Sequence, residues 1–220
     1  MTYQSGLPAY DDARRFPPRV WSAVELTRSR RFAKACTPEV GRLLQLCASL
    51  GGTEKACELG TAFGVGAAGI ESGLRRGATL VTVELDLERA ADASRLFAGC
   101  ESVEVVSGDW SLARNRAPFD LLFSDGGPKR APGDPEKLAP LVRTGGLVVL
   151  DDYTPGNSDK DDPARRIWLG NPYYRAQELM VSPDASVILA VRLLTRGAAM
   201  RRAAAGRGAW RGSRSVRERG

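Results

Sequence analysis

The sequence predicts an α/β fold with a central, mostly parallel seven-stranded sheet, helices on both faces and a C-terminal antiparallel hairpin. Five short apolar runs are separated by helix-like segments, which is the pattern of a parallel sheet covered on both faces. Two further apolar runs close the pattern and are joined only by the turn Ser182-Pro183-Asp184-Ala185, so they are expected to pair as neighbours. A chain of 220 residues is long enough for one such domain with a large core.

The elements follow one another in a regular order. Strands are expected at 55–59, 79–84, 103–106, 119–124, 147–150, 176–181 and 186–193. Helices are expected at 20–33, 65–75, 87–97 and 135–142. A further helix begins at Thr37-Pro38-Glu39, because threonine caps a helix start and proline fits its first position, and it stops at Gly51-Gly52.

The chain divides into three parts by composition. Residues 1–36 are expected to form an N-terminal arm and helix, residues 37–194 the main domain, and residues 195–220 a basic tail. The tail holds eight arginines and one acid, a charge of +7 against +6 for the whole chain, so the remainder is at −1. Arginine mixed with small residues predicts a disordered, solvated extension, and a nucleic-acid-binding arm is the alternative.

Composition excludes several kinds of site. The chain has no histidine, which removes every mechanism with a histidine base, nucleophile or metal ligand. The four cysteines show no C-x-x-C spacing and are expected to be reduced, mostly buried thiols. Neither a cleavable leader nor an apolar run of membrane-spanning length is visible, so the cytoplasm is the expected location.

The segment from Lys55 to Gly66 has the pattern of a cofactor site. An apolar strand runs into a turn with Gly60 and Gly64, where missing side chains let the backbone approach a ligand closely. Glu84 ends the next strand, where a carboxylate can accept hydrogen bonds from two ribose hydroxyls. The alternative is a strand–turn–helix whose glycines serve only packing, and the position of Glu84 favours the cofactor.

The spacing favours one cofactor. A dinucleotide fold needs G-x-G-x-x-G, whereas position 62 is alanine here, which argues against a nicotinamide-dependent oxidoreductase. The carboxylate of Glu58 would repel a pyrophosphate but attract a cationic ligand. S-adenosylmethionine has a sulfonium, an amino group and no phosphate, and therefore fits.

At this point the chain resembles the class I S-adenosylmethionine-dependent O-methyltransferases of the bacterial, caffeoyl-CoA and catechol type. The resemblance covers about Thr37 to Leu193. Its motifs, in order, are Thr37–Leu44, Glu58-Leu59-Gly60-Thr61 with Gly64, Val83–Asp86, Ser107–Trp110, Phe119–Asp125 and Gly145–Asp152. The resemblance implies a Rossmann-like methyltransferase domain at 37–194 that acts on a small molecule, and a homodimer, since related enzymes are often dimers.

The resemblance also implies roles for individual residues. The methionine side of the cofactor would be lined by Glu58, Gly60, Thr61 and Gly64, with Asp125 also at the cofactor. Glu84 would hold the ribose, and Asp109 would meet the adenine amino group. Trp110 would lie beside the adenine ring, although an aromatic residue after a strand is equally often part of the core.

Three carboxylates form a second group. Asp125 ends the fourth strand and Asp151-Asp152 end the fifth, so their side chains are expected to converge in the crevice at the carboxyl ends of the strands. Three oxygen ligands suit Mg²⁺, Ca²⁺ or Mn²⁺. Metal-dependent members of the family have Asp, Asp and Asn there, whereas this chain has a third aspartate. The alternative is that these aspartates only cap turns.

The implied reaction joins the two sites. A divalent ion would bind two oxygens of a catechol or vicinal diol and lower the pKa of the hydroxyl, which would attack the sulfonium methyl. Asp125, Lys129 and Asp151 are the expected catalytic residues, with Lys129 as base or electrostatic helper. The family's lysine follows the aspartate by three residues and Lys129 follows it by four, so an exposed loop lysine is the alternative.

Two other functions stay open. Asn171-Pro172-Tyr173-Tyr174 resembles the N-P-P-Y motif of amino-methyltransferases that act on nucleic acid. That motif belongs after the fourth strand, however, so a loop is expected here and nucleic acid is not the expected partner. A domain that binds the cofactor without turnover is the second alternative. Substrate choice is expected to lie in the N-terminal helices and the loop 153–168.

Overall fold

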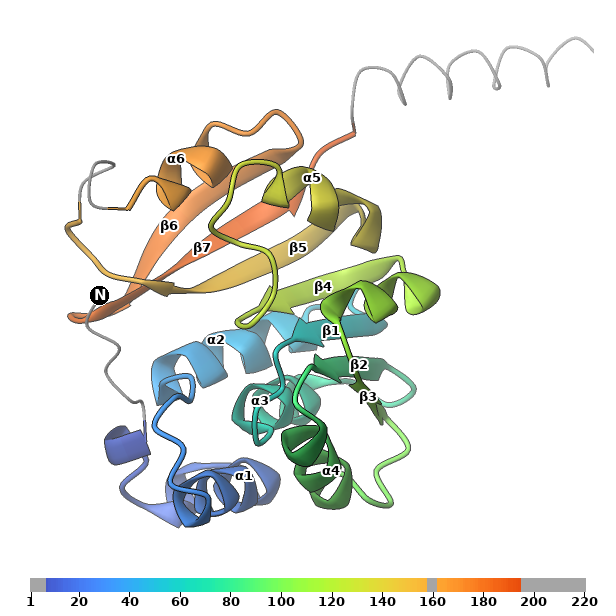
Figure 1. The fold of residues 1–220 in the computed structure, drawn as a ribbon, viewed down its shortest axis with the longest axis vertical. Coiled ribbons are helices and arrows are strands. Elements are labelled where there is room, and N and C mark those ends of the chain that lie inside the picture. The colour runs from blue at the N-terminus through green and yellow to red at the C-terminus, as the bar shows by residue number, and fades with distance from the viewer. Residues whose placement is uncertain (1–6, 158–161, 195–220) are drawn as a thin grey trace, which may run out of the picture.

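A computed structural model gives the structure of the protein and describes residues 7–157 and 162–194. Its centre is a seven-stranded sheet in the order β3-β2-β1-β4-β5-β7-β6 (Figure 1). The strands are β1 Lys55–Leu59, β2 Thr79–Glu84, β3 Val103–Ser107, β4 Phe119–Ser124, β5 Val142–Tyr153, β6 Tyr174–Ser182 and β7 Ala185–Arg192. The first five are parallel, and β7 runs antiparallel to both β5 and β6. The predicted fold class is therefore confirmed.

The helices lie close to their predicted positions. They are α1 Pro18–Ser29, α2 Pro38–Ser49, α3 Val65–Gly73, α4 Leu87–Leu96, α5 Asp134–Leu138 and α6 Ala164–Leu169. Short 3₁₀ helices are η1 Leu7–Ala9, η2 Ala13–Arg15, η3 Trp110–Arg116 and η4 Ala139–Leu141. The predicted cap of α2 is present, since Thr37 Oγ1 accepts a hydrogen bond of 3.3 Å from Val40 N. The sequence analysis did not predict η3 or α6, which are too short to give a clear period.

Each face of the sheet buries its own apolar core. Leu121 and Phe123 of β4 pack with residues of α1, α2 and α3, whereas Leu122 packs with residues of α5 and α6. Figure 1 shows these two helix groups on opposite sides of the sheet. Because successive side chains of one strand enter different cores, the central strands are buried along nearly their whole length rather than at alternate residues.

The segment before α2 belongs to the same folded body. Residues 7–18, expected as a loose arm, contain Tyr10, whose buried side chain donates a hydrogen bond to Cys36 O at 3.3 Å. Val20 and Val24 of α1 lie in the core with α2 and α3. All four cysteines are free thiols, and three are buried. The predicted tail at 195–220 lies outside the described residues.

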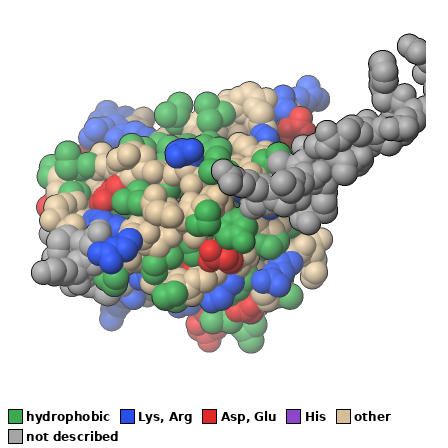
Figure 2. All heavy atoms as spheres, turned by 90° about the horizontal axis from the view of Figure 1, so that it is seen from above, with side chains coloured by type: hydrophobic (Ala, Val, Ile, Leu, Met, Phe, Trp, Pro, Cys, Tyr) green, Lys and Arg blue, Asp and Glu red, His purple; other side chains and the backbone are tan. Residues whose placement is uncertain are grey.

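The surface of the described residues is mixed in charge. On the face shown in Figure 2, basic and acidic side chains are interspersed among apolar ones. Among residues 7–157 and 162–194, no helix combines the length and apolar character that crossing a membrane requires.

Candidate cofactor and active site

A cavity of about 690 Å³ opens at the carboxyl ends of the central strands. Its walls come from residues 32–36, the turn after β1, the ends of β2 and β5, and the loop after β4. The strand order reverses at β1: β2 and β3 lie on one side of it, and β4 and the later strands lie on the other. Ligands of open α/β sheets bind at such a reversal of strand order.

Gly60 lets two segments of the cavity wall approach each other. Its φ is +99°, a conformation that residues with a side chain rarely adopt. A Cβ at this position would lie 2.4 Å from the backbone nitrogen of Gly126. The turn after β1 and the loop after β4 can therefore touch only because neither residue has a side chain.

Glu84 is fixed at the end of β2. Its side chain is 5% exposed, and Oε2 accepts a hydrogen bond of 2.7 Å from Ala62 N, a residue in the left-handed region with φ +47°. Oε1 accepts from Asp86 N at 3.0 Å and from Arg89 Nη2 at 2.8 Å. Arg89 was not predicted at this site. It could have been found from the sequence as a basic residue in the first turn of the helix that follows Glu84.

Glu58 lies behind the cavity wall rather than in it. Thr82 Oγ1 donates to Glu58 Oε2 at 2.5 Å, and the absent side chain of Gly66 leaves room for Oε1. Burial raises the pKa of Glu58 well above its ordinary value. Thr61 is also buried, with its hydroxyl 2.5 Å from that of Thr82.

Of the four residues predicted on the methionine side, only Gly60 is part of the cavity wall. Gly64 faces α4 instead, since a Cβ there would lie 2.9 Å from the side chain of Leu96. Direct contact of the cofactor with Glu58, Thr61 and Gly64 stays a prediction. In the structure these residues support the turn from behind.

Asp109 and Trp110 line the cavity after β3. Asp109 Oδ1 accepts a hydrogen bond of 3.0 Å from Ser111 N and caps η3. Hydrogen bonds from Ser111 hold the pKa of Asp109 below its ordinary value, so it is an ionised acceptor. The half-buried ring of Trp110 lines the cavity and also packs against the core beneath α5 and α6. Its place beside the adenine ring stays a prediction.

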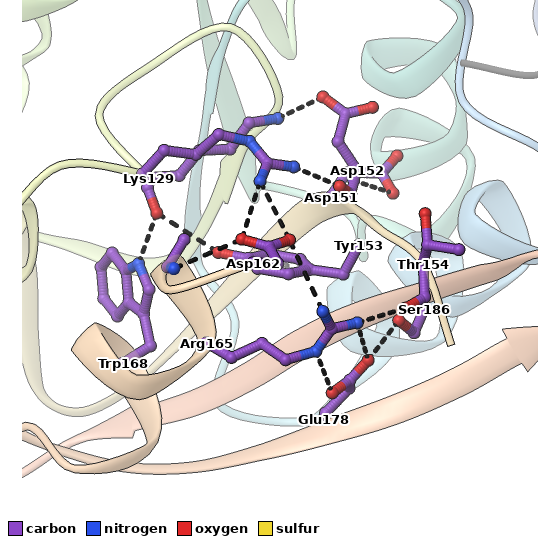
Figure 3. A network of polar contacts seen from close by, with 12 residues as sticks. Lys129, Asp151, Asp152, Tyr153, Thr154, Asp162, Arg165, Trp168, Glu178 and Ser186 are labelled. Atoms are coloured by element: carbon purple, nitrogen blue, oxygen red, sulfur yellow. Dashed lines mark hydrogen bonds and ion pairs between the residues drawn. The ribbon is translucent and has the colours of Figure 1, made fainter. Parts of the chain in front are cut away.

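The predicted group of aspartates surrounds a buried lysine. Lys129 Nζ lies 2.6 Å from Asp152 Oδ2 (Figure 3). It also lies 3.4 Å from Asp125 Oδ1, and Lys129 is 6% exposed. Asp151 Oδ1 accepts from Asp152 N at 2.8 Å. Asp152 has φ +70°, which turns its side chain toward Lys129. The alternative of an exposed loop lysine is therefore wrong for Lys129.

Burial and mutual repulsion set the charges of this group. Enclosure in the protein, followed by the charges of Asp125 and Asp152, raises the pKa of Asp151 to about 7. Burial opposes the charge of Lys129, but the neighbouring carboxylates outweigh it and hold the pKa of Lys129 above its ordinary value. Lys129 is thus an ammonium at neutral pH, which favours the electrostatic role over that of a base.

Two aromatic residues fix the backbone of Lys129. Trp168 Nε1 and Tyr153 Oη donate hydrogen bonds of 2.8 and 3.2 Å to Lys129 O. The next residue, Arg130, donates to Asp152 O and pairs with Asp162 at 3.1 Å. These contacts, drawn around Lys129 and Asp162 in Figure 3, fasten the loop after β4 to the end of β5.

A family profile described as a methyltransferase domain matches residues 57–153. A protein of Mycobacterium tuberculosis named as a probable O-methyltransferase is 33% identical over 140 residues, which cover 60% of this chain and 62% of that protein. The chain thus spans less than two thirds of the length of this relative.

Over these residues the chain is similar to methyltransferase domains and to proteins named as O-methyltransferases.

Solved structures of O-methyltransferases have the same fold as this chain. The Bacillus cereus O-methyltransferase in complex with SAH aligns with a TM-score of 0.66 and 21% identity, over 80% of this chain and 92% of that one. The Streptomyces achromogenes O-methyltransferase TomG, in complex with SAM, aligns with a TM-score of 0.66 and 23% identity, over 81% and 91%. At this identity the likeness shows the fold, which the sheet order already indicated.

The metal ligands predicted from the family resemblance do not assemble. Within residues 7–157 and 162–194, no group of three or more acidic or cysteine side chains is placed to hold a metal ion. Asp125 and Asp152 turn toward the ammonium of Lys129 instead. A divalent ion between these carboxylates would meet a positive charge, so the arrangement does not fit a metal.

The motif that resembled an amino-methyltransferase is a turn in the structure. Asn171 Oδ1 accepts a hydrogen bond of 2.9 Å from Tyr173 N, and Asn171 Nδ2 donates to Glu136 Oε1 at 3.0 Å. Asn171 follows α6 and precedes β6, and the cavity wall does not include it. The prediction of a loop at this position is confirmed.

Proposed function

We propose that the protein transfers the methyl group of S-adenosylmethionine to a hydroxyl oxygen of a small molecule. The observation that carries this proposal is the cavity between the Gly60 turn and Glu84, at the reversal of strand order. A volume of about 690 Å³ is in the range of small-molecule and cofactor sites. The similarity of the chain to proteins named as O-methyltransferases supports the same reaction.

The cofactor would lie across the tips of β1, β2 and β3. Glu84 would accept hydrogen bonds from the ribose hydroxyls, with Arg89 and the Ala62 amide holding its carboxylate in place. Asp109 would accept from the adenine amino group beside the Trp110 ring. The methionine end would pass over Gly60, toward the carboxylates beyond it.

The acceptor would occupy the part of the cavity bounded by Asp125, Lys129 and Asp151. Its hydroxyl oxygen would attack the methyl carbon as the bond from carbon to sulfur breaks, and the Lys129 ammonium would stabilise the developing oxyanion. Asp151 lies in the same wall and would take the proton of the hydroxyl. The predicted catechol or vicinal diol depended on a chelating metal ion, so the acceptor is proposed only as a small-molecule hydroxyl.

The proposed reaction takes place in the cytoplasm on a free small molecule. The near-neutral charge of the chain outside the tail supports this substrate class over nucleic acid. A homodimer stays a prediction from the family resemblance.

Calorimetry with S-adenosylmethionine tests the cofactor part of the proposal. We expect Glu84→Ala to weaken binding about 10- to 100-fold, because lost hydrogen bonds to a charged group cost about 1.5–3 kcal/mol. Glu101→Ala, which removes an exposed carboxylate from another loop, is the matched control and should bind like the wild type. Equal affinity of the wild type and the Glu84 variant would contradict the proposed site.

Mass spectrometry tests the reaction itself. The protein is incubated with S-adenosylmethionine and a panel of phenols, alcohols and catechols, and a mass increase of one methylene on an acceptor is sought. Tight cofactor binding with no methylated acceptor across the panel would favour the cofactor-binding domain without turnover.

A further inference from the structure

The site has its own fixed cation. Lys129 lies within hydrogen-bond distance of both Asp125 and Asp152. Its ammonium is enclosed by the loop after β4 and the end of β5, and its side chain is 7% exposed. It therefore stands where a metal ion shared by these carboxylates would have to bind.

We propose that the Lys129 ammonium takes the place of a divalent cation in this site, so that methyl transfer proceeds without a metal. The proposal rests on the proposed function and assigns the electrostatic part of the reaction to a residue of the chain. Its support is geometric: two of the three carboxylates that the family resemblance predicted as metal ligands, Asp125 and Asp152, are turned toward Nζ and are partly neutralised by it.

Several hydrogen bonds fix the position of Lys129, which distinguishes it from a mobile lysine on the surface. Hydrogen bonds from Tyr153 and Trp168 to Lys129 O fix the point from which its side chain departs. Arg130 adds a second connection through Asp152 O. An ammonium on such a rigid support keeps its position when substrate arrives, which is what stabilisation of a developing charge requires.

If an ammonium replaces the metal ion, the site suits a different class of methyl-accepting substrate. A metal ion can bind two neighbouring oxygens of a catechol at once, which selects vicinal diols. An ammonium has three donors, and in Lys129 two of them face Asp125 and Asp152. The remaining donor can meet one substrate oxygen, so the expected acceptor class is a single acidic hydroxyl, such as a monohydric phenol.

Titration calorimetry with MnCl₂ on the full chain tests the exchange without any turnover. We expect no saturable binding to the wild type at millimolar Mn²⁺. Lys129→Met keeps the apolar stem but removes the charge, which leaves Asp125 and Asp152 free to bind a cation. This variant should bind one Mn²⁺ at least tenfold more tightly than the wild type.

Lys137→Met is the matched control, because it removes another lysine from an ion pair, with Asp134 at 2.8 Å, outside the carboxylate group. It should behave like the wild type. Stoichiometric Mn²⁺ binding by the wild type that Asp152→Asn abolishes would overturn the proposal. So would equal Mn²⁺ affinity of the wild type and a folded Lys129→Met variant.

Two further measurements keep the test decisive. If circular dichroism shows that Lys129→Met does not fold, the wild-type titration alone decides, because a metal site in the wild type contradicts the exchange. Binding of S-adenosylmethionine is measured separately: its absence would refute the proposed function, whereas the Mn²⁺ result speaks only to the role of Lys129.

Discussion

The buried carboxylate of Asp151 gives a stability change with a defined direction and size. Asp151 is 7% exposed, and its pKa is raised from an ordinary 3.8 to about 7. At about 1.4 kcal/mol per pKa unit, the ionised form costs the folded state up to roughly 4 kcal/mol. We expect about 2–4 kcal/mol in practice, because Asp125, Asp152 and Lys129 share the titration.

The sign follows from which state holds the proton more tightly. The folded protein binds the Asp151 proton more tightly than the unfolded chain, so the related stability is fully present below about pH 3.8 and is lost as the pH rises to about 7. Asp151→Asn cannot ionise, and its side-chain oxygen can still accept the hydrogen bond from Asp152 N. The variant should therefore gain stability over the wild type through this pH range and keep the gain above it.

Urea unfolding followed by tryptophan fluorescence between pH 4 and 8.5 measures this difference. The free energy of unfolding of Asp151→Asn minus that of the wild type should rise by about 2–4 kcal/mol across the series. Asp184→Asn, which changes an exposed aspartate in the turn between β6 and β7, is the matched control and should show a flat difference. A difference for Asp151→Asn that does not change with pH would refute the reasoning.

Two further substitutions test the frame around the cavity. Gly60→Ala should lower the free energy of unfolding by about 2–4 kcal/mol through left-handed strain and overlap with Gly126; Gly77→Ala, with φ +87° but no atom within 4 Å, should cost only about 1 kcal/mol in the same denaturation assay. Equal losses in the two variants would mean that the close approach is unimportant. Arg165→Met should cost about 2–4 kcal/mol, measured by thermal unfolding, because Arg165 is 3% exposed and its loss strands the carboxylate of Glu178, 2.7 Å away. A melting temperature unchanged from the wild type would contradict this estimate.

Local sequence patterns determined the fold and the place of the cavity. The alternation of apolar runs and helix-like segments was enough to predict the parallel sheet, because buried strands and capped helices leave patterns over a few neighbouring residues. Thr37 is an example, since both its capping role and the helix it begins are local. Gly60 and Glu84 could be assigned to one cavity because each ends a strand, and parallel strands end at the same edge.

The detailed roles of the polar side chains depended on contacts across the sheet. Glu58 was expected at the methionine, yet its carboxylate turns to Thr82 of β2, because burial beneath α3 leaves it no nearer partner. Lys129 could not be distinguished from an exposed loop lysine, because its enclosure depends on Tyr153 and Trp168, which follow it by 24 and 39 residues.

Sequence alone thus determined the sheet, its longer helices and the edge at which the cavity lies, since strands and long helices leave patterns in consecutive residues. Only the tertiary structure decided which charge stands among Asp125, Asp151 and Asp152. The reason is physical, because a carboxylate can bind either a metal ion or an ammonium group. Which of the two it binds depends on which cation the fold places beside it, and here that cation is Lys129.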